Sequence, residues 1–115
     1  FCIENRAADL TMNVYLALGM TISAAVDGIK NKIDPGKPSD FDLYALKDED
    51  MKKLGIRRLP RNLLQATEAL AKDKIAEKVM GKVMMNSYIN YKNDEWERYH
   101  QAVTDWEIKE YLRLY

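Results

Sequence analysis

The sequence predicts a mainly α fold, with about five helices and a short strand remnant at the N-terminus. Three observations indicate it: an apolar stripe of helical period in residues 10–30, a second such stripe in residues 82–102, and capping signals beside the shorter segments. The 115 residues are 47% hydrophobic, which is enough for one modest core. We therefore treat residues 1–115 as a single compact helical unit.

The strand is predicted over Phe1 to Arg6, where apolar Phe1 and Ile3 alternate with charged residues nearby. A long helix follows over about Leu10 to Lys30. Its apolar positions fall at intervals of four, three, four and three, the period of one buried helical face. These positions are Tyr15, Gly19, Ile22, Val26 and Ile29.

The turn signal in residues 34–36 (DPG) ends this helix and opens an exposed loop over residues 34–46. A short helix is predicted over Lys47 to Leu54, because acidic residues stand in its first turn and basic residues in its last. Gly55 follows as a left-handed cap. The order of the charged residues along this segment, acidic before basic, thus matches the helix dipole.

The C-terminal half reads as helices that follow one another closely. Asn62 caps a helix over about Leu63 to Ala71, and a further helical stretch begins near Asp73. In residues 82–102 and just beyond, the apolar stripe consists of Met85, Ile89, Trp96, Tyr99 and Val103. Residues 104–107 (TDWE) have the spacing of a capping box and open a terminal helix that runs toward Tyr115.

Composition excludes several classes of protein. Eighteen Lys and Arg balance eighteen Asp and Glu, so no net field attracts nucleic acid or an anionic membrane. The single cysteine, Cys2, excludes an internal disulfide, and we expect it to be a small buried side chain. No apolar run has the length of a membrane span, so a cytoplasmic protein is expected. Because the chain begins at Phe1 in an apolar stretch without Met, we interpret it as a fragment.

Few residues suggest chemistry of their own. No phosphate-binding glycine loop, zinc spacing or nucleophile and base pair is present. The lone histidine, His100, is expected to be structural or solvent-facing, since one histidine cannot build a metal site. Five aromatic residues could resemble a base-stacking platform, but helical spacing and zero net charge favour core packing. They are Tyr88, Tyr91, Trp96, Tyr99 and Trp106.

Glu4 and Arg6 are the informative pair. Alternate residues of a strand point to the same face, which sets a carboxylate beside a guanidinium. A carboxylate is a hard ligand for Mg²⁺ or Mn²⁺, and arginine can hold a carboxylate or phosphoryl group through its planar fork. Spacing alone favours an ordinary surface salt bridge.

Longer motifs change that balance. Residues 3–9 (IENRAAD) followed by residues 13–17 (NVYLA) resemble the glutamine synthetase pattern E-x-R, x-x-D, then N-P-Y-L-A. Residues 27–36 (DGIKNKIDPG), 43–44 (LY) and 59–61 (LPR) resemble later elements of the same family, in the same order. The chain is thereby identified as a member of the glutamine synthetase family, covering the C-terminal portion of its α+β catalytic domain.

This resemblance implies an ATP-dependent glutamate-ammonia ligase. Glutamate is phosphorylated on its side chain, and ammonia then attacks the γ-glutamyl phosphate to give glutamine, with Mg²⁺ or Mn²⁺ organising the reaction. The family pattern points to Glu4 as a metal ligand and to Arg6 as the catalytic, substrate-binding arginine. The parent is expected to be a ring-forming homo-oligomer, a dodecamer, and the fragment alone is expected to be inactive because the rest of the site lies upstream.

Some positions depart from the family pattern. Cys2 stands where the family usually has an arginine, so one nucleotide or phosphate contact is missing, and Val14 replaces the proline. Tyr44 aligns with a tyrosine that some bacterial members carry as a nucleotidylation site; packing of the loop is the alternative role for this side chain. The closing segment, residues 95–107, is more similar to the branch that includes γ-glutamylmethylamide synthetases. The C-terminal helix reaches a facing subunit in many bacterial members.

Two alternatives therefore stay open. The parent can be a γ-glutamylmethylamide ligase or act on another small amine. In a different class, the chain can be a non-catalytic helical interaction module or a degenerate family member, for which Cys2 is the best support.

Overall fold

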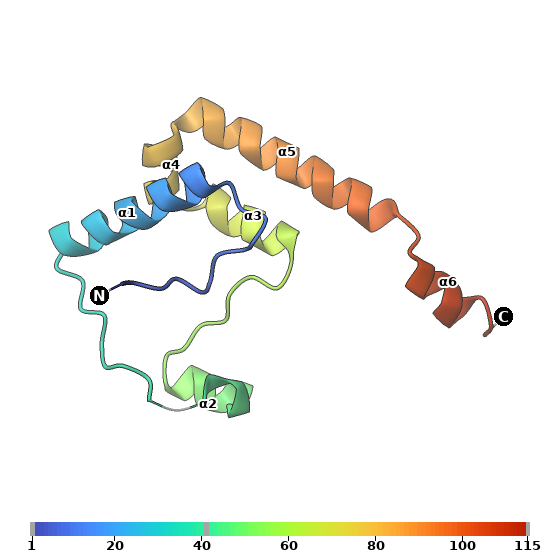
Figure 1. Ribbon diagram of the computed structural model, residues 1–115, viewed down its shortest axis with the longest axis horizontal. Coiled ribbons are helices and arrows are strands. Elements are labelled where there is room, and N and C mark those ends of the chain that lie inside the picture. The colour runs from blue at the N-terminus through green and yellow to red at the C-terminus, as the bar shows by residue number, and fades with distance from the viewer. Residues whose placement is uncertain (1, 41, 115) are drawn as a thin grey trace. The chain divides into compact units, whose positions relative to one another are not determined.

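The computed structural model describes residues 2–40 and 42–114, and the regular structure in these ranges is helical (Figure 1). The elements are α1 (Val14–Lys30), the 3₁₀ turn η1 (Leu43–Ala45), α2 (Asp48–Lys53), α3 (Leu63–Ala71), α4 (Lys74–Met80), α5 (Lys82–Gln101) and α6 (Asp105–Tyr111). The prediction of a mainly α fold is confirmed.

The predicted strand is the first correction. Residues 2–5 have no regular secondary structure, and Phe1 lies outside the described residues. A strand needs a neighbouring strand to pair its N–H and C=O groups. Because no strand occurs among residues 2–40 and 42–114, the backbone of residues 2–5 has no partner strand in this part of the chain.

The long helix starts later than the predicted position near Leu10. Asn13, in an extended conformation, accepts the N–H groups of Tyr15 (3.1 Å) and Leu16 (3.2 Å), so α1 begins at Val14 and not near Leu10. Such a side-chain bond satisfies N–H groups that the first helical turn leaves unpaired. The predicted end at Lys30 agrees with the structure.

The other predicted caps are present: Gly55 has φ 69° after α2, and Asn62 Oδ1 accepts the Gln65 N–H before α3. Asp73, near which a further helix was predicted to begin, is the N-cap of α4. Thr104 and Glu107 form both halves of the capping box before α6. α6 ends at Tyr111, and Tyr115 lies outside the part of the chain that the structure describes.

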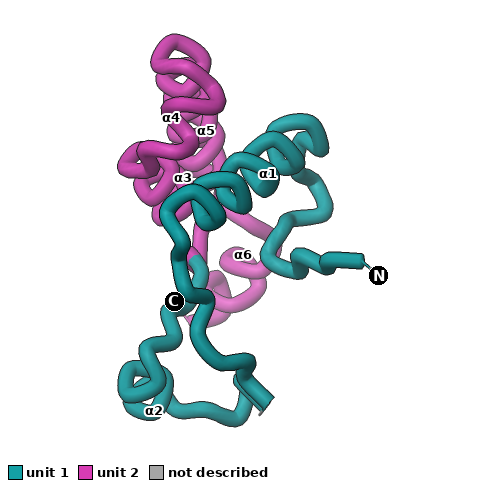
Figure 2. The backbone as a smooth tube through the Cα atoms, turned by 90° about the vertical axis from the view of Figure 1, so that its left-hand side faces the viewer, with its two compact units in different colours: residues 1–59 teal, residues 60–115 magenta. Residues whose placement is uncertain are grey.

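The chain groups into two compact units, residues 1–59 and 60–115 (Figure 2), where the sequence led us to expect one. The first unit holds α1, η1 and α2. In the second, α3 and α4 pack against α5. Contacts therefore concentrate within each half of the chain.

The buried core is small. Among the described residues only Met51, Ala76 and Met85 are buried apolar side chains, together with Thr67, whose hydroxyl donates to the Leu63 carbonyl (2.8 Å). The chain exposes 10934 Å². A compact monomer of 13.4 kDa exposes about 6,500 Å², and two separate compact units of half that mass about 7,800 Å². Much apolar surface is thus uncovered.

The predicted burial of the apolar faces of α1 and α5 is therefore wrong for α1 and only partly correct for α5. No α1 residue is buried, and Tyr15 on the predicted face is 88% exposed. On α5, Met85 is buried and Trp96 partly buried, whereas Tyr99 and Val103 are exposed. A helical period shows which side of a helix can be buried, but burial requires a neighbour. α3 and α4 supply that neighbour for part of α5.

Candidate functional site

Glu4 and Arg6 lie together in the segment that precedes α1. Arg6 Nε donates to Glu4 Oε1 at 2.9 Å, and Arg6 Nη2 donates to Glu4 Oε2 at 3.2 Å. The guanidinium therefore meets the carboxylate along two parallel bonds, the geometry that its planar fork prefers. The sequence prediction that these two side chains lie side by side agrees with the structure, although the segment is not a strand.

The pair is open to solvent. The Arg6 and Glu4 side chains are 82% and 67% exposed. An ion pair at such exposure contributes roughly 0–1 kcal/mol, because water screens it and both side chains lose freedom. Each group can consequently exchange its partner for a metal ion or an anionic substrate at little cost.

Glu4 fits one position of a divalent metal site, but not a whole site. A carboxylate oxygen is a suitable ligand for Mg²⁺ or Mn²⁺, which prefer oxygen donors. No group of three or more His, Cys, Asp or Glu side chains able to hold a metal occurs among the described residues. Any ion bound at Glu4 thus needs further ligands from elsewhere.

Tyr44 stands apart from this pair in the sequence, within η1. Asp42 caps the turn, its Oδ1 accepting the Tyr44 N–H at 2.9 Å, and the Tyr44 side chain is 100% exposed. The hydroxyl is therefore accessible to an external reagent or enzyme.

The remaining predicted positions have plain surroundings. Cys2 is exposed, which contradicts the expected burial, because no element of the described chain covers the N-terminal segment. His100 is exposed and stacks on Trp96, with ring centroids 5.4 Å apart and planes at 16°, as a structural or solvent-facing histidine should. The expected core packing of the aromatic set is wrong for Tyr91, Tyr99 and Trp106, which are exposed.

A half-open hollow of about 670 Å³ between the start of α3 and the last turns of α5 was not apparent from the sequence. Its lining residues are Arg61, Asn62, Leu63, Glu95, Trp96, Arg98 and Tyr99. Lys92 pairs with Glu95 (2.7 Å) and Asp94 with Arg98 (2.8 Å), so two of its charges are already neutralised. Its described lining holds no serine, threonine, cysteine or lysine, the usual nucleophiles of covalent catalysis.

Lys92 and Glu95 are structural in this arrangement. The hydrogen bond to Glu95 raises the pKa of Lys92 above its ordinary value, against a smaller opposing effect of burial. The ammonium also lies 5.4 Å from the Tyr91 ring and 5.9 Å from the Tyr88 ring. This lysine therefore stays charged beside the two tyrosine rings.

None of the described helices combines the length and apolarity needed to cross a membrane.

Comparison with known proteins gives one family. Residues 2–111 match the family described as "Glutamine synthetase, catalytic domain". Relatives include a glutamine synthetase from Methanocaldococcus jannaschii, 39% identical over 110 residues, which cover 96% of this chain and 24% of the relative. A glutamate-methylamine ligase from Methyloversatilis universalis is 36% identical over 113 residues, covering 98% of this chain and 25% of the relative.

A glutamine synthetase from Staphylococcus aureus is 34% identical over 113 residues, which cover 98% of this chain and 25% of the relative. The chain thus spans about a quarter of the length of these relatives. Glu4 and Arg6 both lie inside the matched range, at its N-terminal end.

Proposed function

The chain belongs to the glutamine synthetase family, in the C-terminal part of its catalytic domain, and from this premise we propose that its parent protein is a cytoplasmic glutamate-ammonia ligase. In the proposed reaction ATP phosphorylates the side-chain carboxylate of glutamate, and ammonia displaces phosphate from the γ-glutamyl phosphate. The observation that carries the proposal is the Glu4 and Arg6 pair, at the E-x-R position of a match extending over residues 2–111.

We assign Glu4 as one ligand of Mg²⁺ or Mn²⁺. When bound, the ion would neutralise charge on the γ-phosphate of ATP. Arg6, released from its exposed partner, holds the glutamate substrate and the transferring phosphoryl group. A fixed guanidinium stabilises the charge that develops on that group during transfer. The small stability of the exposed pair, roughly 0–1 kcal/mol, makes this exchange of partners easy.

The 115-residue chain alone is proposed to be inactive. Glu4 is a single carboxylate, and the described residues hold no metal-binding cluster around it. The parent supplies the remaining metal ligands and the nucleotide pocket, and assembles as a ring-forming homo-oligomer, a dodecamer. γ-Glutamyl hydroxamate formation by the isolated chain would contradict this.

Methylamine in place of ammonia is a specific alternative. One relative is a glutamate-methylamine ligase and matches 98% of this chain, as closely as several glutamine synthetases do. The kcat/KM of the parent should be compared with ammonia and with methylamine as the amine. A preference for methylamine assigns the enzyme to that branch, and a preference for ammonia to the synthetases.

A non-catalytic parent is the alternative from another class, and Cys2 is its support. Arginine at this position would restore an anion contact, and one charge-assisted hydrogen bond contributes about 1.5–3 kcal/mol. We expect Cys2→Arg to lower the KM for ATP about tenfold in an active parent. An inactive parent that also lacks upstream metal ligands would favour the degenerate class.

The central test is ATP-dependent amide formation by the purified parent and its variants. Glu4→Gln removes the charge of the metal ligand, and Arg6→Lys removes the fork, so each should lower kcat about 10²-fold or more. Arg57→Lys is the matched control, since Arg57 is an exposed arginine outside the pair, and should leave kcat unchanged. A fully active Glu4→Gln enzyme would refute the assignment.

Tyr44 is proposed as a site of nucleotidylation, because its side chain is fully exposed in a capped turn. Intact-mass and peptide mass spectrometry of parent protein purified from its source should find a nucleotidyl group on this residue. Tyr15, an 88% exposed tyrosine, is the control that should stay unmodified. An unmodified Tyr44 under both nitrogen-rich and nitrogen-poor growth would contradict the assignment.

A further inference from the structure

Three side-chain oxygens between Arg6 and α1 each accept the N–H of the residue two positions later. The bonds are Asn5 Oδ1 to Ala7 N–H (3.1 Å), Asp9 Oδ1 to Thr11 N–H (2.7 Å) and Asn13 Oδ1 to Tyr15 N–H (3.1 Å). Each is an Asx turn, in which a short polar side chain replaces a backbone acceptor. The acceptors are four residues apart, so the turns follow one another from Arg6 to the first turn of α1.

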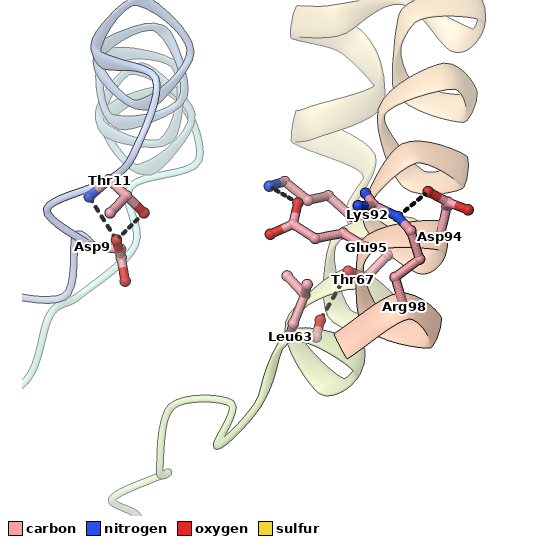
Figure 3. Close-up of polar contacts among 8 residues, drawn as sticks. All are labelled: Asp9, Thr11, Leu63, Thr67, Lys92, Asp94, Glu95 and Arg98. Atoms are coloured by element: carbon pink, nitrogen blue, oxygen red, sulfur yellow. Dashed lines mark hydrogen bonds and ion pairs between the residues drawn. The ribbon is translucent and has the colours of Figure 1, made fainter. Parts of the chain in front are cut away.

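Asp9 makes the strongest turn of the three. Its Oδ1 accepts both the N–H (2.7 Å) and the hydroxyl (2.6 Å) of Thr11, as Figure 3 shows, and its carbonyl accepts the Met12 N–H (3.2 Å). Hydrogen bonds to an ionised acceptor are shorter and about twice as strong as neutral ones. The backbone between Arg6 and α1 is therefore held mainly at this residue.

The Arg6 guanidinium bonds to exposed Glu4, and the three turns join the Arg6 backbone to the first turn of helix α1. The turns therefore fix the path of the chain between Arg6 and α1. We propose that Asp9 is a positioning residue: its turn fixes the Arg6 backbone relative to α1, and thereby the place of the Arg6 guanidinium in the parent active site. This inference rests on the function proposed above.

The expected effect follows from the role of Arg6. A displacement of about 1 Å at a reacting group can lower the rate about 10²-fold. The bidentate fork of arginine also requires the correct direction, not only the correct distance. Loss of the Asp9 turn should therefore reduce kcat and weaken glutamate binding, while the KM for ATP changes little.

The test compares three variants of the full-length parent. Asp9→Ala removes the turn and should lower kcat at least tenfold. Asp9→Asn keeps the acceptor oxygen and should stay within threefold of the wild type. Asp34→Ala is the matched control, because Asp34 Oδ1 accepts the Gly36 N–H (2.9 Å) in the same kind of turn beyond α1, and should leave kcat unchanged.

A second measurement separates this inference from the proposed function. In the 115-residue chain, ¹⁵N relaxation should show that Asp9→Ala, but not Asp34→Ala, increases the mobility of the Arg6 amide. If that mobility stays unchanged, or if Asp9→Asn lowers kcat as far as Asp9→Ala, the positioning role is wrong. An inactive wild-type parent counts against the proposed function alone, since the relaxation result still decides the role of Asp9.

Discussion

The C-terminal end of α1 places a lysine where helices usually carry glycine. Lys32 has φ 50°, in the left-handed region. Two bonds of a Schellman motif surround it: the Lys32 N–H donates to the Ile29 carbonyl (3.2 Å) and the Ile33 N–H to the Gly28 carbonyl (2.9 Å). We predict that Lys32→Gly stabilises this end of the helix.

The magnitude follows from two opposing effects. An L-residue in the left-handed region costs roughly 1–2 kcal/mol, which glycine avoids. Glycine loses about 0.5–1 kcal/mol more backbone entropy than other residues on ordering. The net stabilisation expected for Lys32→Gly is therefore about 0.5–1 kcal/mol.

The end of α2 supplies the reverse experiment. Gly55 has φ 69° in the same motif, with the Ile56 N–H donating to the Met51 carbonyl (2.9 Å). A Cβ at Gly55 would meet no atom within 4 Å, so Gly55→Ala changes only backbone energy. By the same reasoning its cost is about 0.5–1 kcal/mol.

Amide hydrogen exchange measures both effects locally. At 0.5–1 kcal/mol, protection of the Ile33 amide should rise about two- to fivefold in Lys32→Gly, and that of the Ile56 amide should fall by a similar factor in Gly55→Ala. Unchanged or lower protection of Ile33 in Lys32→Gly, with the expected loss at Ile56, would show that the left-handed lysine carries no strain.

Three further predictions concern other helix ends. Val14→Pro should stabilise α1 by about 0.4–1 kcal/mol, because Val14 is the first helical residue and the residue before it is extended. Thermal unfolding should show a higher Tm for this variant, and a lower Tm would contradict the prediction. Gly81→Ala should destabilise the α4–α5 junction by about 1–3 kcal/mol, since φ 73° and ψ 151° suit only glycine. Gly28→Ala, within α1, is the control and should not destabilise the protein. Equal effects of the two substitutions on urea unfolding would contradict this prediction. Bonds from the Thr104 backbone N–H and hydroxyl hold the pKa of Glu107 below its ordinary value of 4.5. The capping contribution to α6 is therefore complete above pH 4.5 and is lost as the pH falls through the lower folded-state pKa. A chemical-shift titration of the Thr104 amide should show this step, and Glu107→Gln should abolish it.

Helix ends were the most predictable part of this fold. Asn62 and Thr104 each cap the helix that the sequence assigns to them, because a capping bond joins residues two or three positions apart. The start of α1 was predicted too early, near Leu10. The apolar positions of this helix begin only at Tyr15, and the side-chain bonds of Asn13 decide that the helix begins at Val14.

In the candidate site, too, the sequence predicted only a contact between residues that are close together in the chain. Glu4 and Arg6 are two residues apart, so their pairing needs no tertiary contact, and the structure shows it without the strand that first suggested it. The turn made by Asp9 was not anticipated. An aspartate followed two residues later by threonine is a signal that could have indicated it.

By itself the sequence determined the helices, their caps, the pairing of Glu4 with Arg6 and the family, because each depends on residues close together in the chain or on motifs in a set order. Only the tertiary structure decided which apolar faces are covered. Trp96 and Tyr99 lie on one predicted stripe, yet Trp96 is partly buried and Tyr99 is exposed, as is Tyr15 on α1. A periodic pattern marks the side of a helix that can be buried, whereas burial needs a second surface, which α3 and α4 provide for only part of α5.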